Sequence, residues 1–177
     1  MKKLTTIVTA VLLLAFIGTT HAQSPNPLKA DSRTVTMGVG FGVPYGVLGT
    51  NTDISFSDNF SSSMGLGTTI LSGMAYNFGM RFFLAQPAST FRPRISAFYG
   101  VNSIIESGSF LIDEYESFEG ITLGFGAEMM FGSSKANGLD FDIMYIATTG
   151  YDADELRSRG YEVSGGAKIS LGYRHAF

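Results

Sequence analysis

The chain has 177 residues, enough for one domain with a substantial interior. It contains 22 Gly, 15 Phe and 8 Tyr but no Cys or Trp, and only 15% of its residues are charged. The lack of Cys excludes disulfides, iron–sulfur clusters and thiol catalysis, and the many apolar and aromatic residues exclude disorder. A net charge of −3 argues against a nucleic-acid-binding surface, so no nucleic-acid partner is predicted.

The beginning of the chain has the pattern of a secretory signal peptide. A basic start at Lys2 and Lys3 precedes the apolar run Ile7–Ile17, which ends in a cleavage pattern before Gln23. The alternative, a membrane-spanning helix, needs about 20 apolar residues, and this run is shorter. We therefore expect three parts: a cleaved signal peptide over 1–22, a short periplasmic linker over 23–32 and one folded domain over 33–177.

From residue 34 onward, apolar and polar residues alternate in short segments. In one of them Ile121, Leu123 and Phe125 alternate with Thr122 and Gly124. A period of two residues is typical of β-strands with two different faces. The pattern predicts eight strands, over 34–43, 48–56, 63–70, 74–82, 94–102, 121–131, 139–145 and 162–177.

Eight antiparallel strands can form a soluble sandwich or barrel with its apolar face inward, or a transmembrane barrel with its apolar face outward. The polar faces here are rich in Gly, Ser and Thr and carry few charges. Small residues suit the inside of a narrow eight-stranded barrel, whereas a solvated outer face would be rich in Lys and Glu. The sequence therefore predicts an all-β, eight-stranded antiparallel up-and-down transmembrane β-barrel.

The connections fit this topology if the N-terminus is periplasmic. The outward connections are then Pro44–Val47, Leu71–Gly73, Ser103–Ser117 and Thr148–Gly160, and the two longest connections are among them, as in outer-membrane barrels. Both long loops are acidic. They are predicted to be either solvated loops or sites for a surface ligand, over 103–117 and 148–160.

Eight charged residues fall on the polar, lumen-facing positions of the predicted strands, four of each sign. They are Asp53, Arg81, Arg94, Glu128, Asp140, Asp142, Lys168 and Arg174. An unpaired ion inside a narrow barrel would be costly, whereas a compensated set is tolerated. The pattern favours a structural salt-bridge network that fills the lumen; the alternatives are a narrow polar channel and a pair of catalytic carboxylates.

The predicted export signal, the eight strands and an aromatic last residue resemble small outer-membrane barrels of the OmpA/OmpX-like type. Tyr173 and Phe177 on the last strand resemble the signal read by the barrel assembly machinery. The segments 42–46 and 92–96, followed by Tyr99-Gly100, resemble the "outer membrane protein beta-barrel domain" group of Bacteroidetes-like bacteria. The resemblance implies a place in the bacterial outer membrane, contact with its lipid, and periplasmic chaperones and the assembly machinery as partners during biogenesis.

Candidate catalytic chemistry is sparse. Lipid A-modifying barrel enzymes need a histidine, and the only histidine after the signal peptide is His175, with no His-x-Ser-Asn pattern around it. No catalytic, cofactor-binding or metal-binding residue is predicted, and no cofactor. The sequence favours a non-enzymatic outer-membrane barrel with a structural or surface-interaction role. The alternatives are a small porin-like channel for solutes or ions and, less favoured, a lipid A-modifying enzyme.

Overall fold

The computed structural model describes the chain except residues 1–34, 70–72, 110–111 and 159–165. The predicted signal peptide and linker therefore lie outside the described residues. The described part of the folded unit extends from Val35 to Phe177, with the gaps just given.

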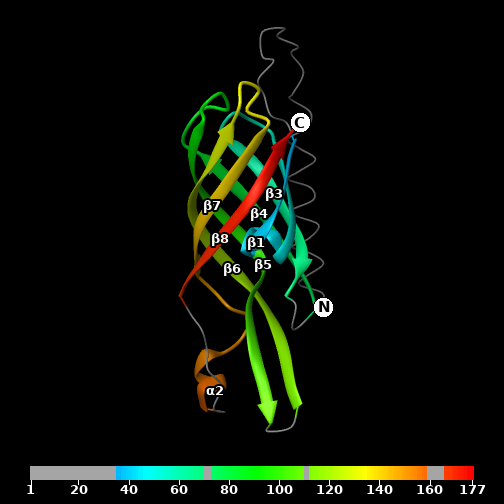
Figure 1. Cartoon of the computed structure of the whole chain (residues 1–177). Helices are drawn as coiled ribbons and strands as arrows, with labels where there is room; N and C mark the ends of the chain where they lie inside the picture. Colours follow the sequence, from blue (N-terminus) through cyan, green and yellow to red (C-terminus); the bar gives the residue numbers. More distant parts are fainter. Residues whose placement is uncertain (1–34, 70–72, 110–111, 159–165) are drawn as a thin grey trace. The chain divides into compact units, whose positions relative to one another are not determined.

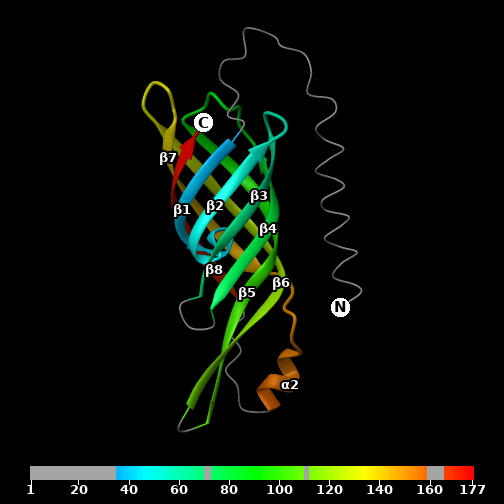
Figure 2. The same ribbon diagram turned by 90° about the vertical axis from the view of Figure 1, so that its right-hand side faces the viewer.

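This unit is a closed barrel of eight antiparallel strands, each hydrogen-bonded to its neighbours in the chain, and β1 pairs with β8 to close the barrel. Figures 1 and 2 show the strands tilted around a common axis. This confirms the predicted up-and-down barrel. The strands are β1 Val35–Gly42, β2 Val47–Ser55, β3 Phe60–Thr68, β4 Met74–Phe83, β5 Phe91–Ser109, β6 Ile112–Phe131, β7 Asn137–Ile146 and β8 Ala167–Ala176.

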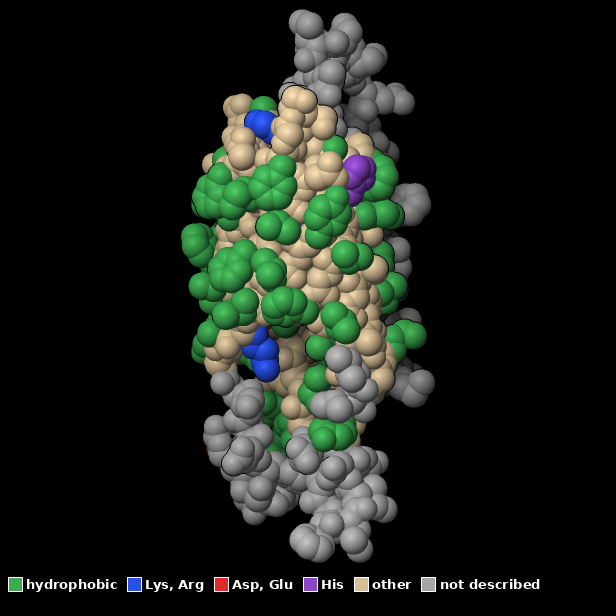
Figure 3. Space-filling model, in the orientation of Figure 1, with side chains coloured by type: hydrophobic (Ala, Val, Ile, Leu, Met, Phe, Trp, Pro, Cys, Tyr) green, Lys and Arg blue, Asp and Glu red, His purple; other side chains and the backbone are tan. Residues whose placement is uncertain are grey.

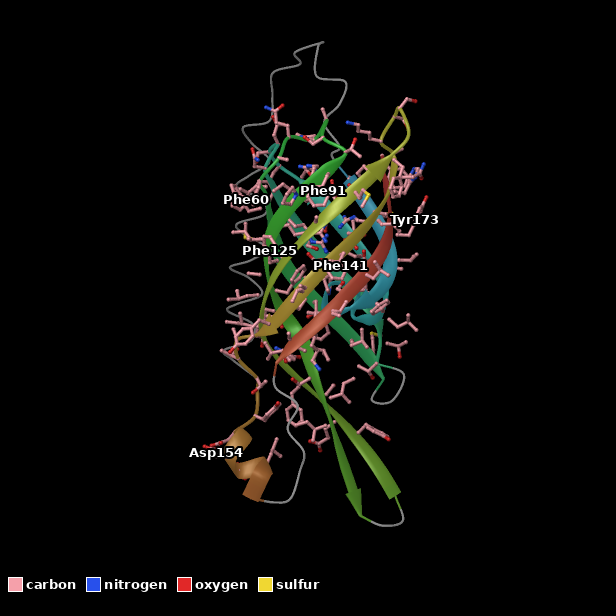
Figure 4. All side chains as sticks on the ribbon, turned by 60° about the vertical axis from the view of Figure 1, so that its left-hand side comes forward. Phe60, Phe91, Phe125, Phe141, Asp154 and Tyr173 are labelled. Carbon is pink, nitrogen blue, oxygen red and sulfur yellow. The ribbon has the colours of Figure 1, made fainter. Side chains whose placement is uncertain are left out.

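The barrel wall is apolar outside and polar inside. Phe125 is 60% exposed on β6 and Tyr145 is 61% exposed on β7, while Asp140 and Arg81 are buried at 1% and 0%. Figure 3 shows apolar side chains over much of the wall, with basic side chains on this face only near its ends, and Figure 4 shows Phe125, Phe141 and Tyr173 on three adjacent strands. This distribution reverses the one in a water-soluble protein.

Among the residues that the structure describes, no helix is long and apolar enough to cross a membrane.

β5 and β6 are about twice as long as the other strands, so the prediction of a loop over 103–117 is wrong for most of that segment. The two strands stay paired from Ser103↔Phe118 to Ser109↔Ile112, after a β-bulge between Val101 and Ser103. The resulting hairpin extends past the other strands in Figure 1. Backbone hydrogen bonds hold it, and these do not require alternating side chains, so the sequence pattern carries no sign of it.

The other long connection, 148–160, contains one short helix, α2 Ala153–Ser158. Its N-terminal turn is held by the Asp152 carboxylate, which accepts hydrogen bonds from the backbone N–H groups of Asp154, at 2.9 Å, and Glu155, at 3.3 Å. These acidic residues thus serve in part to begin a helix.

The β1–β2 connection folds into the barrel, which corrects the expectation that Pro44–Val47 faces outward. Its 3-10 helix η2, Val43–Tyr45, is fully buried and contacts β3, β4 and β5 as well as its own strands. Gly42, with φ of 107°, and Gly46, with φ of 61°, adopt the left-handed conformations that reverse the chain into the lumen. Val43–Gly46 is called the infolded turn below.

Candidate functional site in the barrel lumen

Three arginines meet one carboxylate oxygen in the lumen. Oδ2 of Asp140 on β7 lies 3.2 Å from Arg81 Nη1, 2.8 Å from Arg94 Nη2 and 3.0 Å from Arg174 Nη1. These arginines come from β4, β5 and β8, and all three side chains are completely buried. Asp140 is therefore the point at which strands on different sides of the barrel are joined.

Two further aspartates complete the neutralisation of these arginines. Asp53 Oδ2 lies 2.6 Å from Arg174 Nη2 and 3.1 Å from Arg81 Nη1, and Asp142 Oδ2 lies 2.6 Å from Arg94 Nη2. The lumen charge cluster is thus a formally neutral set of three guanidinium and three carboxylate groups: Asp53, Arg81, Arg94, Asp140, Asp142 and Arg174.

Small residues beside the charges let the arginines cross the lumen. Arg81 lies between Ser61 on β3 and Ser96 on β5 in the strand register, and Asp142 lies between Gly126 on β6 and Ser170 on β8. Neighbouring inward positions on adjacent strands are close enough for large side chains to collide. The Gly and Ser residues that suggested a narrow barrel also leave room for long side chains to reach opposite walls.

Arg92 forms a second ion pair toward the end of the lumen where β5 begins. It lies directly opposite Glu128 in the register, with 2.8 Å between Nη1 and Oε1. Its Nη2 donates to the Asp58 carbonyl at 2.9 Å, its Nε donates to the Ala85 carbonyl at 3.3 Å, and its guanidinium lies 3.9 Å from the Phe83 ring centroid. Arg92 therefore ties two inter-strand turns together across this end of the barrel.

Tyr45 connects the infolded turn to the charge cluster. Its hydroxyl donates to Asp140 Oδ1 at 2.5 Å. Its ring lies on the β1–β8 seam, where a Cβ added at Gly38 or Gly40 would lie 3.3 Å or 3.0 Å from ring carbons and one at Gly172 would overlap the hydroxyl. These lumen glycines therefore leave the space that the tyrosine fills.

Beyond Tyr45, the infolded turn makes one apolar and one polar attachment. Val43 forms a small buried cluster with Phe98 on β5 and Met144 on β7. Asn51 Nδ2 on β2 donates to the Pro44 carbonyl at 2.9 Å. The lumen at this level is occupied by the protein's own backbone and side chains.

The structure brings most, but not all, of the eight predicted lumen residues together. Six form the lumen charge cluster, and Glu128 pairs with Arg92 instead. Lys168 lies opposite Met144, is only half-buried and does not join the cluster.

Two important lumen residues are missing from the set that the sequence predicts. Arg92 lies two residues before Arg94 and therefore on the same face of the strand. Pro93 lies between them, however, and the predicted strand begins only at Arg94. Tyr45 falls in a connection where no periodicity applies, so its position in the lumen has no sequence signal apart from the facing glycines.

The predicted assembly-signal residues lie on the outer surface of the last strand and at its end. Tyr173 is 46% exposed and Phe177 is 71% exposed. His175 stacks edge-on against Phe177, with 4.7 Å between ring centroids, and its Nδ1 lies 2.9 Å from Asn137 Oδ1. This position, outside the lumen charge cluster, is that of an aromatic surface residue.

The arrangement has an evident chemical consequence. Each carboxylate of the cluster accepts from at least one guanidinium, and all six groups are buried. Buried groups that are ion-paired in this way neutralise one another and join strands, although Asp53 Oδ1, Arg81 Nε and Nη2, Arg94 Nη1 and Arg174 Nε have no hydrogen-bond partner among the described residues. None of these six side chains is exposed on the surface of the barrel.

The fit between Tyr45 and the β1–β8 seam gives a testable expectation. Gly172→Ala places a methyl group where the Tyr45 hydroxyl lies, and overpacking of this kind typically costs about 1–3 kcal/mol. We expect urea unfolding in lipid vesicles to show this loss, and the double variant Gly172→Ala/Tyr45→Ala to lose less than the sum of the two single variants. Strict additivity would mean that the ring does not occupy this space.

Comparison with known proteins gives a fold but no family. No protein-family model matches the chain, and no curated protein has a significantly similar sequence. The crystal structure of the N-terminal β-barrel domain of Pseudomonas aeruginosa OprF is similar, with a TM-score of 0.58 and 14% sequence identity over 81% of this chain and 96% of that one. At this identity the likeness establishes the architecture alone: the chain has the eight-stranded barrel fold of that OprF domain.

Proposed function

We propose that this protein is a non-enzymatic integral outer-membrane β-barrel whose lumen is closed by the charge cluster and the infolded turn, with a structural or surface-interaction role. The observation that carries the proposal is the reversed polarity of the wall. Large apolar side chains are exposed on all eight strands, while the charged groups of the cluster are completely or almost completely buried.

An outer wall with this much exposed apolar surface fits the hydrocarbon core of a lipid bilayer. The largest exposed apolar patch on a soluble monomer is usually about 300–600 Å², whereas apolar side chains here extend around the whole barrel, with Met37 on β1, Leu123 on β6 and Leu171 on β8 each more than 40% exposed. Closure between β1 and β8 also leaves no open sheet edge within the barrel wall, as a bilayer demands.

The outer membrane is the location that we propose, because single-chain barrels of this kind are typical of it. The predicted signal peptide and the aromatic end of the last strand support the same assignment. In this proposal outer-membrane lipid surrounds the wall, and periplasmic chaperones and the barrel assembly machinery act during biogenesis. Membership of the small OmpA/OmpX-like group that the sequence resembles belongs to the same proposal.

The proposal that the lumen is closed depends on the lumen charge cluster. Three guanidinium and three carboxylate groups within a narrow barrel hold one another by short contacts, from 2.6 to 3.2 Å. An ion passing this level would have to displace paired groups, which is costly because each would be left buried without a partner.

A small channel is the second candidate. Asn51 Oδ1, Asn77 Oδ1 and Ser96 Oγ are buried without a hydrogen-bond partner among the described residues, and all three side chains line the lumen. Such atoms would favour a hydrated path around the cluster.

Conductance decides between the two. We expect the native protein in a planar bilayer to show no stable unitary conductance, and Arg81→Ala to raise ion leakage by opening space beside Asp53 and Asp140. Lys168→Ala, outside the cluster, is the matched control and should leave leakage unchanged. Stable unitary conductance of the native protein would favour the channel, provided that heat-modifiable gel mobility shows that the barrel is folded.

The long β5–β6 hairpin and the 148–160 connection are the regions that we propose for contact with a surface ligand. The hairpin continues beyond the strands that flank it, since β4 pairs with β5 only as far as Gly100 and β7 pairs with β6 only from Thr122. Replacing 103–117 by a tight turn should leave the folded barrel intact and remove binding to intact cells or matrix proteins. Unchanged binding would move the contact to another part of the surface.

A further inference from the structure

The infolded turn rejoins β2 through a strained residue. Val47 has φ of 72°, and among the described residues the only other non-glycine residue with positive φ is Lys135. Left-handed backbone is unfavourable for a β-branched residue, and such strain persists only where the surrounding structure enforces it. At the other end of the turn Gly42 adopts its positive φ without this cost.

The infolded turn lies beyond the last pair of the β1–β2 ladder. The β1–β2 ladder ends at the pair Gly42↔Val47, and the nearest turn hydrogen bonds, Gly46 N–H to the Val43 carbonyl and Leu48 N–H to the Gly46 carbonyl, are local. The turn is attached to the rest of the lumen through the Tyr45 hydroxyl, the Pro44 carbonyl and the Val43 side chain. Its backbone also packs against β3, where a Cβ added at Gly65 or Gly67 would overlap a carbonyl oxygen of the turn. Rotation at Gly42 and Val47 would release these contacts and leave intact the β1–β2 pairs from Phe41↔Leu48 onward.

From this arrangement we infer that the infolded turn is a hinged strap. It leaves the lumen in a minor conformation of the folded barrel, and the hydrogen bond from Tyr45 to Asp140 is the catch that holds it in. Strain at Val47 favours release and the catch opposes it, so the two set the population of the released state. Release uncovers Asp140 Oδ1 and the glycine-lined β1–β8 seam. It therefore controls access to the charge cluster from the side that the infolded turn covers.

The absence of native cysteine provides a direct assay. In Val43→Cys the single thiol replaces a side chain that is 4% exposed in the infolded state, and it becomes accessible to a water-soluble maleimide only when the turn moves. Ser61→Cys places a thiol at a lumen position that is completely buried and away from the turn, so it reports opening of the whole barrel. Labelling is measured in detergent, so the result does not depend on conductance or on membrane location.

Second-site changes at two positions separate the effect of the Tyr45 hydrogen bond from the effect of the strain at Val47. Tyr45→Phe keeps the ring and removes the hydroxyl; a hydrogen bond to a carboxylate is worth about 10- to 100-fold in an equilibrium, so labelling of Val43→Cys should rise by about tenfold or more. Val47→Gly relieves the strained φ and should lower the labelling rate by about fivefold. Val47→Ala retains a Cβ and the strain, and should leave the rate near that of the parent.

The expected result is faster labelling at position 43 than at position 61 in the parent, with Tyr45→Phe accelerating only the former. Equal rates at the two positions would overturn the inference, because the turn would then open only together with the barrel. A parallel rise at both positions in Tyr45→Phe would overturn it as well. Should Tyr45→Phe fail to fold, the opposed effects of Val47→Gly and Val47→Ala still test the hinge, and equal rates in these two variants would count against it.

Discussion

Asp140→Asn is expected to destabilise the barrel more than any other conservative substitution in the lumen. The carboxylate accepts from Arg81, Arg94 and Arg174 through one oxygen and from Tyr45 through the other. Removing its charge leaves three buried guanidinium groups to share two aspartates. Loss of one partner from a buried ion pair typically costs about 3–5 kcal/mol, and less where water enters.

Urea unfolding of the protein in lipid vesicles measures this loss. Glu116→Gln, on an exposed side chain of the hairpin, is the matched control for removing one carboxylate and should change the free energy of unfolding little. The double variant Asp140→Asn/Arg81→Met should lose less than the two single changes added together, because the charge balance is restored. Equal stability of Asp140→Asn and the native protein would show that the cluster is hydrated and that the lumen is open.

An arginine on the outer wall is expected to have the second-largest effect. Leu123 on β6 and Ile143 on β7 are 48% and 49% exposed near the middle of their strands. In the proposed membrane placement Leu123→Arg or Ile143→Arg puts a charge near the midplane of the bilayer, at a cost of about 2–4 kcal/mol.

The matched comparison is made on the opposite face of the same strand. Thr122, next to Leu123, is completely buried in the lumen, and Thr122→Ser should be tolerated because it keeps the hydroxyl that accepts from Asn102. Folding into vesicles of defined thickness gives the free-energy difference. If Leu123→Arg changes the free energy of folding as little as a substitution at a solvated position does, the outer wall does not face hydrocarbon and the proposed membrane placement is wrong.

How far the sequence determines the architecture is clear from individual strands. Ile121, Leu123 and Phe125 face outward and Thr122 and Gly124 face inward, as their alternation predicts. A strand has a strict period of two, so once one residue is correctly assigned to a face, the inward or outward direction of every other side chain in the strand follows. The alternation disappears beyond Val101, and there the sequence pattern predicts a loop where β5 continues to Ser109.

The lumen shows the limit of the same reasoning. Alternation places Arg81, Asp140 and Arg174 inside, but the convergence of the arginines on one Asp140 oxygen depends on the tilt and stagger of the closed barrel. The two-residue period shows which face a side chain is on, but it does not show which inward side chains of different strands lie at the same height along the barrel axis. For this reason Lys168, although on an inward-facing register, lies apart from the cluster, while Arg92 finds its partner Glu128 directly across the strand pair.

The sequence by itself therefore determined the strand order, the two faces of the wall and most of the charges that the interior must neutralise, because these follow from local periodicity and composition. Only the tertiary structure decided which charges meet and that Val43–Gly46 folds inward to place Tyr45 against Gly172. Those features depend on groups that are brought together from distant parts of the chain. A connection without periodicity has no sequence pattern that shows whether solvent or the barrel's own interior will surround it.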